Sequence, residues 1–244
     1  MPNTNLLEMR GITKSFFGNK ALNNVDFEIR KGEVHVLVGE NGAGKSTLMK
    51  ILSGAYTKDT GAIIWNGQEV QIAGPLSAQK IGISIIYQEF NLIRGMSVSE
   101  NLFLGREPLT ALGFVDATLR DRQTREWLDR LSVANVRPTD LVQDLSTAQS
   151  QFVSIAQALS RGARLIIMDE PTAALTPKET QTLFCLIRGL KKDGVSVIFI
   201  SHHLNELFEI GDRITVLRDG QFVATLDVEQ THKDEIIRLM VGRE

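Results

Sequence analysis

Continuous apolar runs alternate with segments of helical periodicity along much of the chain. Four runs have the length and composition of strands buried on both faces: VHVLV (34–38), IGISIIYQ (81–88), RLIIMDE (164–170) and VSVIFISHH (195–203). Helical patterns follow the first and third runs, at KSTLMKILSG (45–54) and PKETQTLFCLIRGLKKDG (177–194). This order of elements predicts an α/β fold with a mainly parallel sheet and flanking helices.

Strand-like segments with turn signals precede and follow these runs, as in antiparallel hairpins. They are LEMRGITKSF, NVDFEIRKG and GAIIWNGQEV in the N-terminal part, and DRITVLRDGQFVATLD (212–227) near the C-terminus. A terminal helix is expected at 229–242. An N-terminal antiparallel β subdomain is therefore predicted beside the parallel sheet. Turns are expected at Gly18-Asn19, Asn66-Gly67 and Asp219-Gly220.

Residues 89–163 differ from the rest because charged segments with a 3.6-residue period dominate them. ATLRDRQTREWLDRLS (117–132) spaces leucines among charges, and a second helix is expected after Leu145, with Ser146 as its N-cap. We interpret this stretch as a helical subdomain inserted between two strands of the sheet. The chain, 1–244, is then one domain whose core is formed by 1–88 and 164–244.

A glycine-rich loop joins the first buried strand to the first helix. It fits the phosphate-loop pattern G-x-x-x-x-G-K-[ST] with Gly39-Glu40-Asn41-Gly42-Ala43-Gly44-Lys45-Ser46. Glycines let backbone N–H groups converge on phosphate oxygens, and the following helix adds its positive end. Lys45 is expected to reach the β- and γ-phosphates of ATP, and the Ser46 hydroxyl to ligate Mg²⁺. Thr47 is included among the nucleotide-binding residues.

Two acidic residues end the apolar strand of the third run. Asp169 is expected at the carboxyl edge of the sheet, where α/β proteins bind ligands, and to hold Mg²⁺ through water. Glu170 is suited to orient and deprotonate an attacking water. The alternative is that both are ordinary polar groups at a strand end. With the glycine-rich loop nearby, the pair favours phosphoryl chemistry.

Composition limits the function classes. Apolar residues make up 43% and charged residues 23% of the chain, as in a globular protein, and a net charge of −2 gives no global attraction to nucleic acid. No run approaches the roughly 20 apolar residues that span a bilayer, and no signal-peptide pattern opens the sequence. The expected location is the cytoplasm, with any membrane role exercised through a partner. The single cysteine, Cys185, is expected to be buried in the core.

Taken together, these motifs resemble those of the ATP-binding subunits of ABC transporters, in the same order and over nearly the whole chain. The phosphate loop and LIIMDEP are two of the matching motifs. The others are Gln88 in IIYQEF for the glutamine loop, Leu145 to Gln149 for the LSGGQ signature, Ala173 to Thr176 for the D-loop, and His202 for the switch histidine.

The resemblance implies a P-loop NTPase core and a role for each motif. Gln88 would contact Mg²⁺ and the attacking water, and sense a membrane partner. His202 would bind the γ-phosphate; the alternative is a surface histidine after a strand, and His203 lies beside it. Phe16 would stack on adenine, with Phe17 as the alternative, and either could instead be a core aromatic.

The signature-like segment implies an active site shared between two domains. In ABC dimers the signature closes on the γ-phosphate bound by the opposite subunit, so Ser146, Thr147, Ala148 and Gln149 would contact the partner's ATP. Thr147 and Ala148 stand where the family has two glycines, and Thr176 stands where many relatives have Asp. The resemblance leaves open whether the site completed by this signature hydrolyses ATP fast, slowly or not at all.

Three segments resemble one particular group within this family. EPTAALTPKE, ISHHLNELFEIGDRITVLRDGQ and LMVGRE resemble ATPases of bacterial importers for ribose-, galactose- or arabinose-type sugars, in which two such domains are commonly fused. The implied partners are a second nucleotide-binding domain (tandem or homodimeric), membrane permease subunits and, indirectly, a periplasmic sugar-binding protein. This places the chain at the cytoplasmic face of the bacterial inner membrane. The alternatives are an ABC ATPase that serves no transporter, and a nucleotide-binding module with weak hydrolysis.

Overall fold

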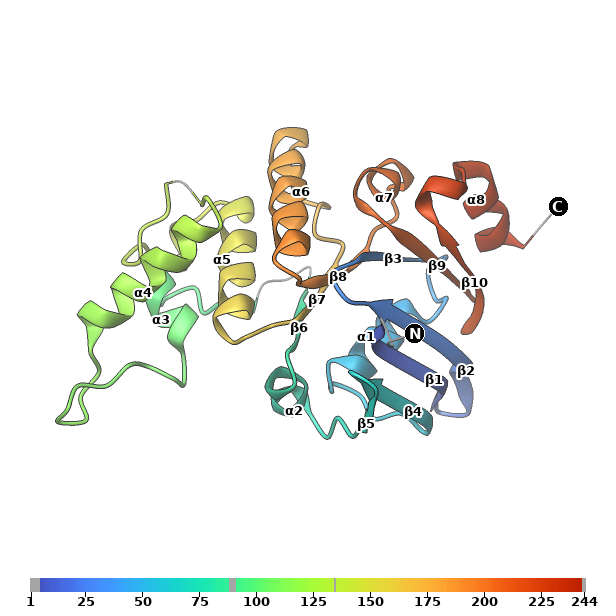
Figure 1. Cartoon of the computed structure of the whole chain (residues 1–244), viewed down its shortest axis with the longest axis horizontal. Coiled ribbons are helices and arrows are strands. Elements are labelled where there is room, and N and C mark those ends of the chain that lie inside the picture. The colour runs from blue at the N-terminus through green and yellow to red at the C-terminus, as the bar shows by residue number, and fades with distance from the viewer. Residues whose placement is uncertain (1–4, 88–90, 134, 243–244) are drawn as a thin grey trace. The chain divides into compact units, whose positions relative to one another are not determined.

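The computed structural model describes residues 5–87, 91–133 and 135–242 (Figure 1). Its first sheet is antiparallel, with four strands in the order β2-β1-β4-β5, and confirms the predicted N-terminal β subdomain. The predicted turn at Asn66-Gly67 joins β4 to β5, and both residues have positive φ, as a two-residue hairpin turn of this kind requires. The strands are β1 (Asn5–Phe16), β2 (Asn19–Arg30), β4 (Thr60–Trp65) and β5 (Gln68–Val70).

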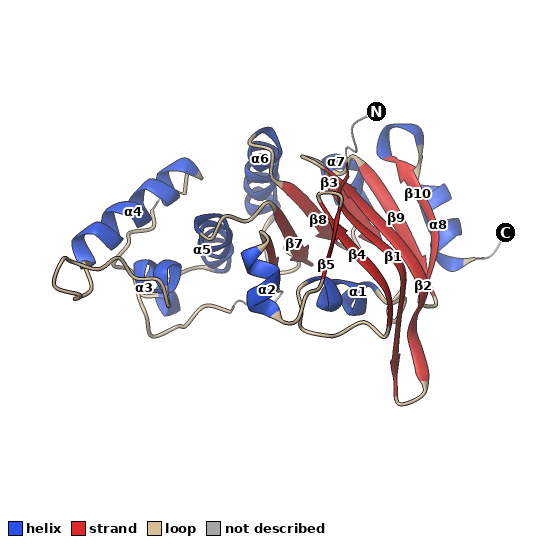
Figure 2. Cartoon of the chain, turned by 60° about the horizontal axis from the view of Figure 1, so that its bottom comes forward, coloured by secondary structure: helices blue, strands red, loops and turns tan. Residues whose placement is uncertain are grey.

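The second sheet has six strands in the order β10-β9-β3-β8-β7-β6 (Figure 2). β3 pairs in parallel with β8 and β9, β8 pairs in parallel with β7, and the predicted hairpin adds β10 antiparallel to β9. All residues of β3 and β8 are buried, as in a parallel sheet covered on both faces. The predicted α/β fold with a mainly parallel sheet is confirmed. The strands are β3 (Val34–Val38), β6 (Ile83–Ile86), β7 (Leu165–Asp169), β8 (Ser196–Ile200), β9 (Arg213–Arg218) and β10 (Gln221–Asp227).

Helix α1 (Lys45–Leu52) belongs to a core that includes residues of both sheets. Its apolar side chains Leu48, Met49, Ile51 and Leu52 are all buried in that core. Burial of side chains of this size stabilises the fold by about 1.5–3 kcal/mol each. Since α1 starts directly after the glycine-rich loop, this packing fixes the position of the loop.

Helices are present in the segments predicted to be helical, and two further short helices, α2 (Pro75–Lys80) and α7 (Leu204–Ile210), were not predicted. α5 begins after the predicted N-cap Ser146, whose hydroxyl accepts the Gln149 N–H at 3.2 Å, and a terminal helix is present as expected. No helix among residues 5–87, 91–133 and 135–242 is long and apolar enough to cross a membrane. The helices are α2 (Pro75–Lys80), α3 (Val98–Phe103), α4 (Ala117–Arg130), α5 (Thr147–Ser160), α6 (Pro177–Lys192), α7 (Leu204–Ile210) and α8 (Lys233–Val241), with 3₁₀ turns at Val142–Asp144 and Val228–Gln230.

The chain forms two compact units. The first consists of residues 1–85, 163–170 and 187–244 and contains the strands from β1 to β5 and from β7 to β10. The second consists of residues 86–162 and 171–186 and contains α3, α4 and α5.

Cys185 is exposed, so the prediction that it is a buried core residue was wrong. The buried side chains of α6 are Leu183, Phe184, Ile187 and Leu190, which recur at the spacing of one helix face. Cys185 lies outside this face. The apolar run around it is long enough to fit more than one face, which is why the sequence pattern alone was misleading.

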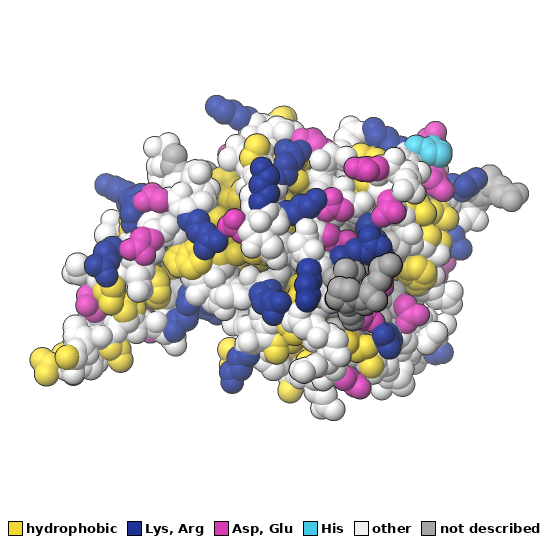
Figure 3. Space-filling model, in the orientation of Figure 1, with side chains coloured by type: hydrophobic (Ala, Val, Ile, Leu, Met, Phe, Trp, Pro, Cys, Tyr) yellow, Lys and Arg dark blue, Asp and Glu magenta, His cyan; other side chains and the backbone are white. Residues whose placement is uncertain are grey.

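The loop between α3 and α4 is an ordered apolar projection of the second unit (Figure 3). Leu109 and Val115 form an antiparallel bridge, and the Thr110 N–H donates to the Phe114 carbonyl at 2.8 Å. At the tip, Leu112 is 85% and Phe114 71% exposed. Apolar side chains presented in this way are a common feature of contact surfaces.

A buried polar cluster surrounds His35 in the middle of β3. The His35 Nδ1 lies 3.0 Å from Glu33 Oε1, and its Nε2 lies 2.7 Å from Thr215 Oγ1. Arg213 places Nη1 3.6 Å from the same Glu33 oxygen and donates through Nη2 to Glu28 at 2.7 Å. Burial lowers the pKa of His35, although the neighbouring Glu33 carboxylate acts in the opposite direction. His35 is therefore neutral in the folded chain at pH 7.

Acidification is expected to destabilise the fold through this cluster. Because the pKa of His35 is lower in the folded chain than its ordinary value of 6.5, the unfolded chain binds the proton more readily, and the free energy of unfolding falls as the pH drops below that value. Urea unfolding of the wild type at near-neutral and mildly acidic pH measures this fall, which should be smaller in His35→Gln. The exposed His232→Gln serves as the control and should behave like the wild type. An equal fall in all three chains would contradict the prediction.

Candidate functional site

The loop between β3 and α1 has the backbone geometry of a phosphate cradle. Gly44 is the N-cap of α1 at φ +98°, and a Cβ atom there would lie 2.7 Å from Leu22 Cδ2 and 2.9 Å from the Ala21 carbonyl, so the position requires glycine. The N–H groups of residues 45–47 lie in the first helical turn and have no acceptor within the helix. The loop therefore presents backbone donors and a positive helix end to an anion.

The Lys45 ammonium lies against the loop. Its Nζ donates to the Gly39 carbonyl at 2.7 Å and to the Glu40 carbonyl at 3.0 Å. Burial lowers the pKa of Lys45, whereas the charges of Glu170 and Asp169 raise it. The lysine is thus held at the loop by neutral acceptors and lies near two carboxylates.

Asp169 and Glu170 follow one another where β7 ends. Burial raises the pKa of Asp169, the charge of Glu170 raises it further, and Lys45 and Lys50 act in the opposite direction. A nearby cation would stabilise the ionised form of Asp169. The carboxyl ends of β7 and β8 meet at the same sheet edge, since these strands are parallel neighbours.

Glu170 has a left-handed backbone, with φ +49°. Its N–H donates to the Ile200 carbonyl at 2.9 Å. Few non-glycine residues adopt this conformation, and those that do are concentrated at functional sites. The side chain is one-third exposed, and Oε1 lies 3.3 Å from the His202 Nδ1. The structure thus brings together the two residues predicted to be the general base and the switch histidine.

The phosphate loop, the start of α1 and the acidic pair after β7 line one cavity of about 200 Å³. Eight of the predicted site residues form part of the cavity wall: Asn41, Gly42, Gly44, Lys45, Ser46, Thr47, Asp169 and Glu170. Gly39, Glu40 and Ala43 shape the loop from within, through the carbonyls that accept from Lys45 and the Ala43 N–H that donates to the Glu40 carbonyl at 3.1 Å. Ala21 and Ile200 also line the cavity and were missed, because a small or apolar strand residue carries no chemical signal in a sequence.

The two candidate aromatics differ in their surroundings. Phe16 is half-buried and packs edge-on against Tyr56, with 5.2 Å between ring centroids. Phe17 is fully exposed at φ +49°. Neither lies in the wall of the cavity described above. Gln88, the predicted glutamine-loop residue, lies outside the described residues.

The signature-like segment lies in the second unit, at the start of α5. The Ser146 N–H donates to Gln149 Oε1 at 2.8 Å, and the Gln149 N–H donates to the Ser146 hydroxyl, so the two side chains form a capping box. Of the two residues that replace glycines, Ala148 is buried and Thr147 is exposed. Compared with a signature that has two glycines here, the exposed surface of this helix start therefore gains the Thr147 side chain but not that of Ala148.

The fold and the phosphate-loop cavity define a P-loop nucleotide-binding domain. The model of the ABC transporter family matches residues 22–173, and the chain belongs to this family. The ribose import ATP-binding protein RbsA 1 of Rubrobacter xylanophilus is 55% identical over 238 residues, 98% of this chain and 47% of that protein. RbsA of Geobacillus kaustophilus is 49% identical over 240 residues, 98% of this chain and 48% of that protein. The chain spans about half the length of the curated relatives it matches.

Solved structures agree on the fold. The ADP conformation of the ATP-binding cassette MJ1267 has a TM-score of 0.82 at 24% identity and covers 98% of this chain and 99% of that one. The dimeric post-hydrolysis state of the cassette MJ0796, bound to ADP and Pi, has a TM-score of 0.77 at 26% identity and covers 91% and 98%. The predicted P-loop NTPase core is thereby confirmed.

Proposed function

We propose that the chain binds ATP in the cavity between the phosphate loop and β7 and hydrolyses it when paired with a second nucleotide-binding domain. One observation carries this proposal: Lys45 and Ser46 line the same cavity as Asp169 and Glu170. Phosphoryl transfer needs donors and a cation for the phosphates, and a carboxylate for the metal and the attacking water. All of these groups converge here.

The residues present fit Mg²⁺. The Ser46 hydroxyl and the Asp169 carboxylate are hard oxygen donors, and Mg²⁺ in nucleotide sites is commonly held by one or two such groups together with substrate phosphates. Burial and the charge of Glu170 raise the pKa of Asp169, and a bound cation would stabilise the ionised form of this carboxylate. Bound Mg²⁺ would supply neutralisation of phosphate charge. Gln88 remains a predicted ligand.

Glu170 is assigned the role of general base. Its carboxylate would orient the attacking water and accept the proton that the water loses. His202, 3.3 Å from that carboxylate, would donate a hydrogen bond from its imidazole to the γ-phosphate. Phe16 is proposed to stack on adenine by movement of the ring from its contact with Tyr56.

The second half of each active site is proposed to come from the partner domain. Ser146, Thr147, Ala148 and Gln149 lie at a helix start, where backbone N–H groups attract anions. The capping box engages the N–H groups of Ser146 and Gln149, so the N–H groups of Thr147 and Ala148 are the donors proposed to contact the partner's ATP.

The biological role that we propose is to power the import of a carbohydrate. The resemblance to ribose import ATP-binding proteins over 98% of the chain supports this role. Permease subunits would be the membrane partners, a periplasmic sugar-binding protein the indirect one, and the cytoplasmic face of the membrane the location. An ABC ATPase that serves no transporter has no specific observation in its favour.

Calorimetry and phosphate-release assays test the proposal. Mg-ATP should bind with about one nucleotide per chain, and phosphate release per chain should rise with protein concentration, because two domains complete each site. Chelation of Mg²⁺ is the control and should stop phosphate release. Failure to bind Mg-ATP would overturn the proposal. Binding without phosphate release at any protein concentration would instead identify a nucleotide-binding module.

A further inference from the structure

His203 is in contact with the proposed switch histidine. The ring centroids of His202 and His203 lie 4.0 Å apart, with an angle of 45° between the ring planes. His202 is otherwise open to solvent, with 60% of its side chain exposed. An imidazole in such an open position retains rotamer freedom, and fixing it for contact with a phosphate has an entropic cost.

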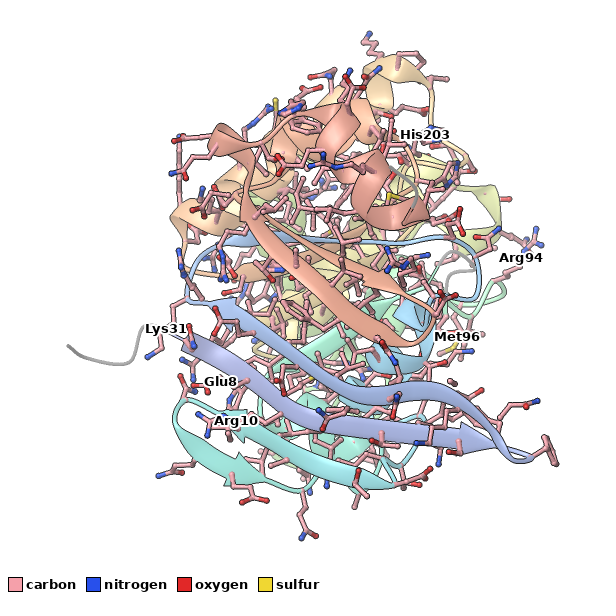
Figure 4. All side chains as sticks on the ribbon, turned by 90° about the vertical axis from the view of Figure 1, so that its right-hand side faces the viewer. Glu8, Arg10, Lys31, Arg94, Met96 and His203 are labelled. Atoms are coloured by element: carbon pink, nitrogen blue, oxygen red, sulfur yellow. The ribbon has the colours of Figure 1, made fainter. Side chains whose placement is uncertain are left out.

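The backbone of His203 is held firmly from both sides. Its N–H donates to the Ser201 hydroxyl at 3.0 Å, and that hydroxyl donates to Glu206 Oε2 at 2.9 Å. Its carbonyl accepts the N–H of Glu206 at 2.9 Å, which closes the first turn of α7. His203 is labelled in Figure 4. Leu207, one residue further along, is completely buried and fixes α7. His203 is thus attached to a rigid part of the first unit.

The imidazole of His203 does not cap the helix that it precedes. His203 is the N-cap of α7, but within the described part of the chain its side chain makes no capping hydrogen bond. His232, at the N-cap of α8, is in the same situation, with a side chain that is 73% exposed. His203 has a ring neighbour in His202, whereas the His232 Nδ1 lies 3.8 Å from Glu235 Oε2. His232 is therefore a matched control for the ring contact.

We propose that His203 is a positioning residue for ATP hydrolysis, whose ring restricts His202 to the conformation that contacts Glu170 and faces the γ-phosphate. The contacts form a continuous path from Glu206 through Ser201 and His203 to His202, which lies 3.3 Å from the Glu170 carboxylate. His203 itself is not among the residues that line the phosphate-loop cavity. This inference rests on the proposed function, because it concerns the same hydrolysis.

The role predicts a selective loss of turnover. In His203→Ala the ring contact disappears while the backbone N–H to Ser201 remains, so kcat should fall by about threefold to tenfold with an unchanged KM for ATP. His203→Phe restores a planar ring and should recover kcat to within about twofold of the wild type. His232→Ala should leave kcat unchanged. Thermal melting of each variant checks that the fold is intact.

Each result bears on one of the two proposals. A wild-type chain that releases no phosphate would overturn the proposed function, and this inference with it. Phosphate release by the wild type together with an unchanged kcat in His203→Ala would overturn only the inference. The inference also fails if His203→Phe is as slow as His203→Ala, because ring packing is then not the cause. A changed KM at constant kcat would indicate a role in nucleotide binding and would contradict it as well.

Discussion

Glu170→Gln is expected to lower the rate of phosphate release by about 10²- to 10⁴-fold and to leave the affinity for ATP nearly unchanged. The amide has almost the shape of the carboxylate, so the left-handed backbone at φ +49° and the contact with His202 should persist. It has no negative charge and accepts no proton from water. The loss therefore falls on the chemical step, and single-turnover phosphate release together with calorimetry separates it from binding.

The control for Glu170→Gln is Glu209→Gln. Glu209 lies in α7 and forms an ion pair with Arg188 at 3.3 Å on the surface of the first unit. Loss of this pair should leave phosphate release unchanged. Full turnover in Glu170→Gln would remove Glu170 as the base and would direct attention to Asp169 or His202.

Lys45→Ala is expected to weaken ATP binding by about tenfold to a hundredfold, the range for loss of hydrogen bonds from a charged donor. Lys45 belongs to the cavity wall, and its Nζ, 2.7 Å from the Gly39 carbonyl, already lies at the loop that would hold the phosphates. Calorimetric titration with Mg-ATP measures the loss directly. Lys45→Ala therefore affects nucleotide binding, whereas Glu170→Gln affects the hydrolytic step.

Lys50→Ala is the matched control for the lysine. Lys50 is in the same helix, but its Nζ lies 5.3 Å from the Tyr56 ring centroid and it is absent from the cavity wall. Its removal should change ATP affinity by no more than about twofold, since it acts on Asp169 only through a distant charge. Equal affinity of Lys45→Ala and the wild type would refute the phosphate-cradle assignment.

The sequence predicted the elements of the site because each has a strong local pattern. The run VHVLV, the glycines and the helix beginning at Lys45 are consecutive, so strand, loop and helix follow from neighbouring residues. Asp169 and Lys45 line the same cavity, as expected from the rule that α/β proteins bind ligands at the carboxyl ends of their parallel strands. Ser146 was predicted as an N-cap because serine is a preferred residue at that position, and the structure adds the capping box with Gln149.

Features that depend on side-chain direction could not be predicted in this way. The sequence places Thr147 and Ala148 side by side, and only the fold determines that one is exposed and the other buried. His203 was noted only as the neighbour of His202, because ring contact between adjacent residues depends on the backbone at the strand end. Cys185 was misplaced because an apolar helix does not reveal from its composition which face packs.

The bonds from Lys45 to the carbonyls of Gly39 and Glu40 have an energetic consequence. An incoming triphosphate has to compete with partners that the ammonium already possesses. The binding energy it gains from this side chain is the difference between two sets of acceptors, one neutral and one anionic, which is smaller than the full strength of an ionic hydrogen bond. The same two hydrogen bonds hold the Lys45 ammonium at the loop before the nucleotide binds, so less side-chain entropy is lost on binding.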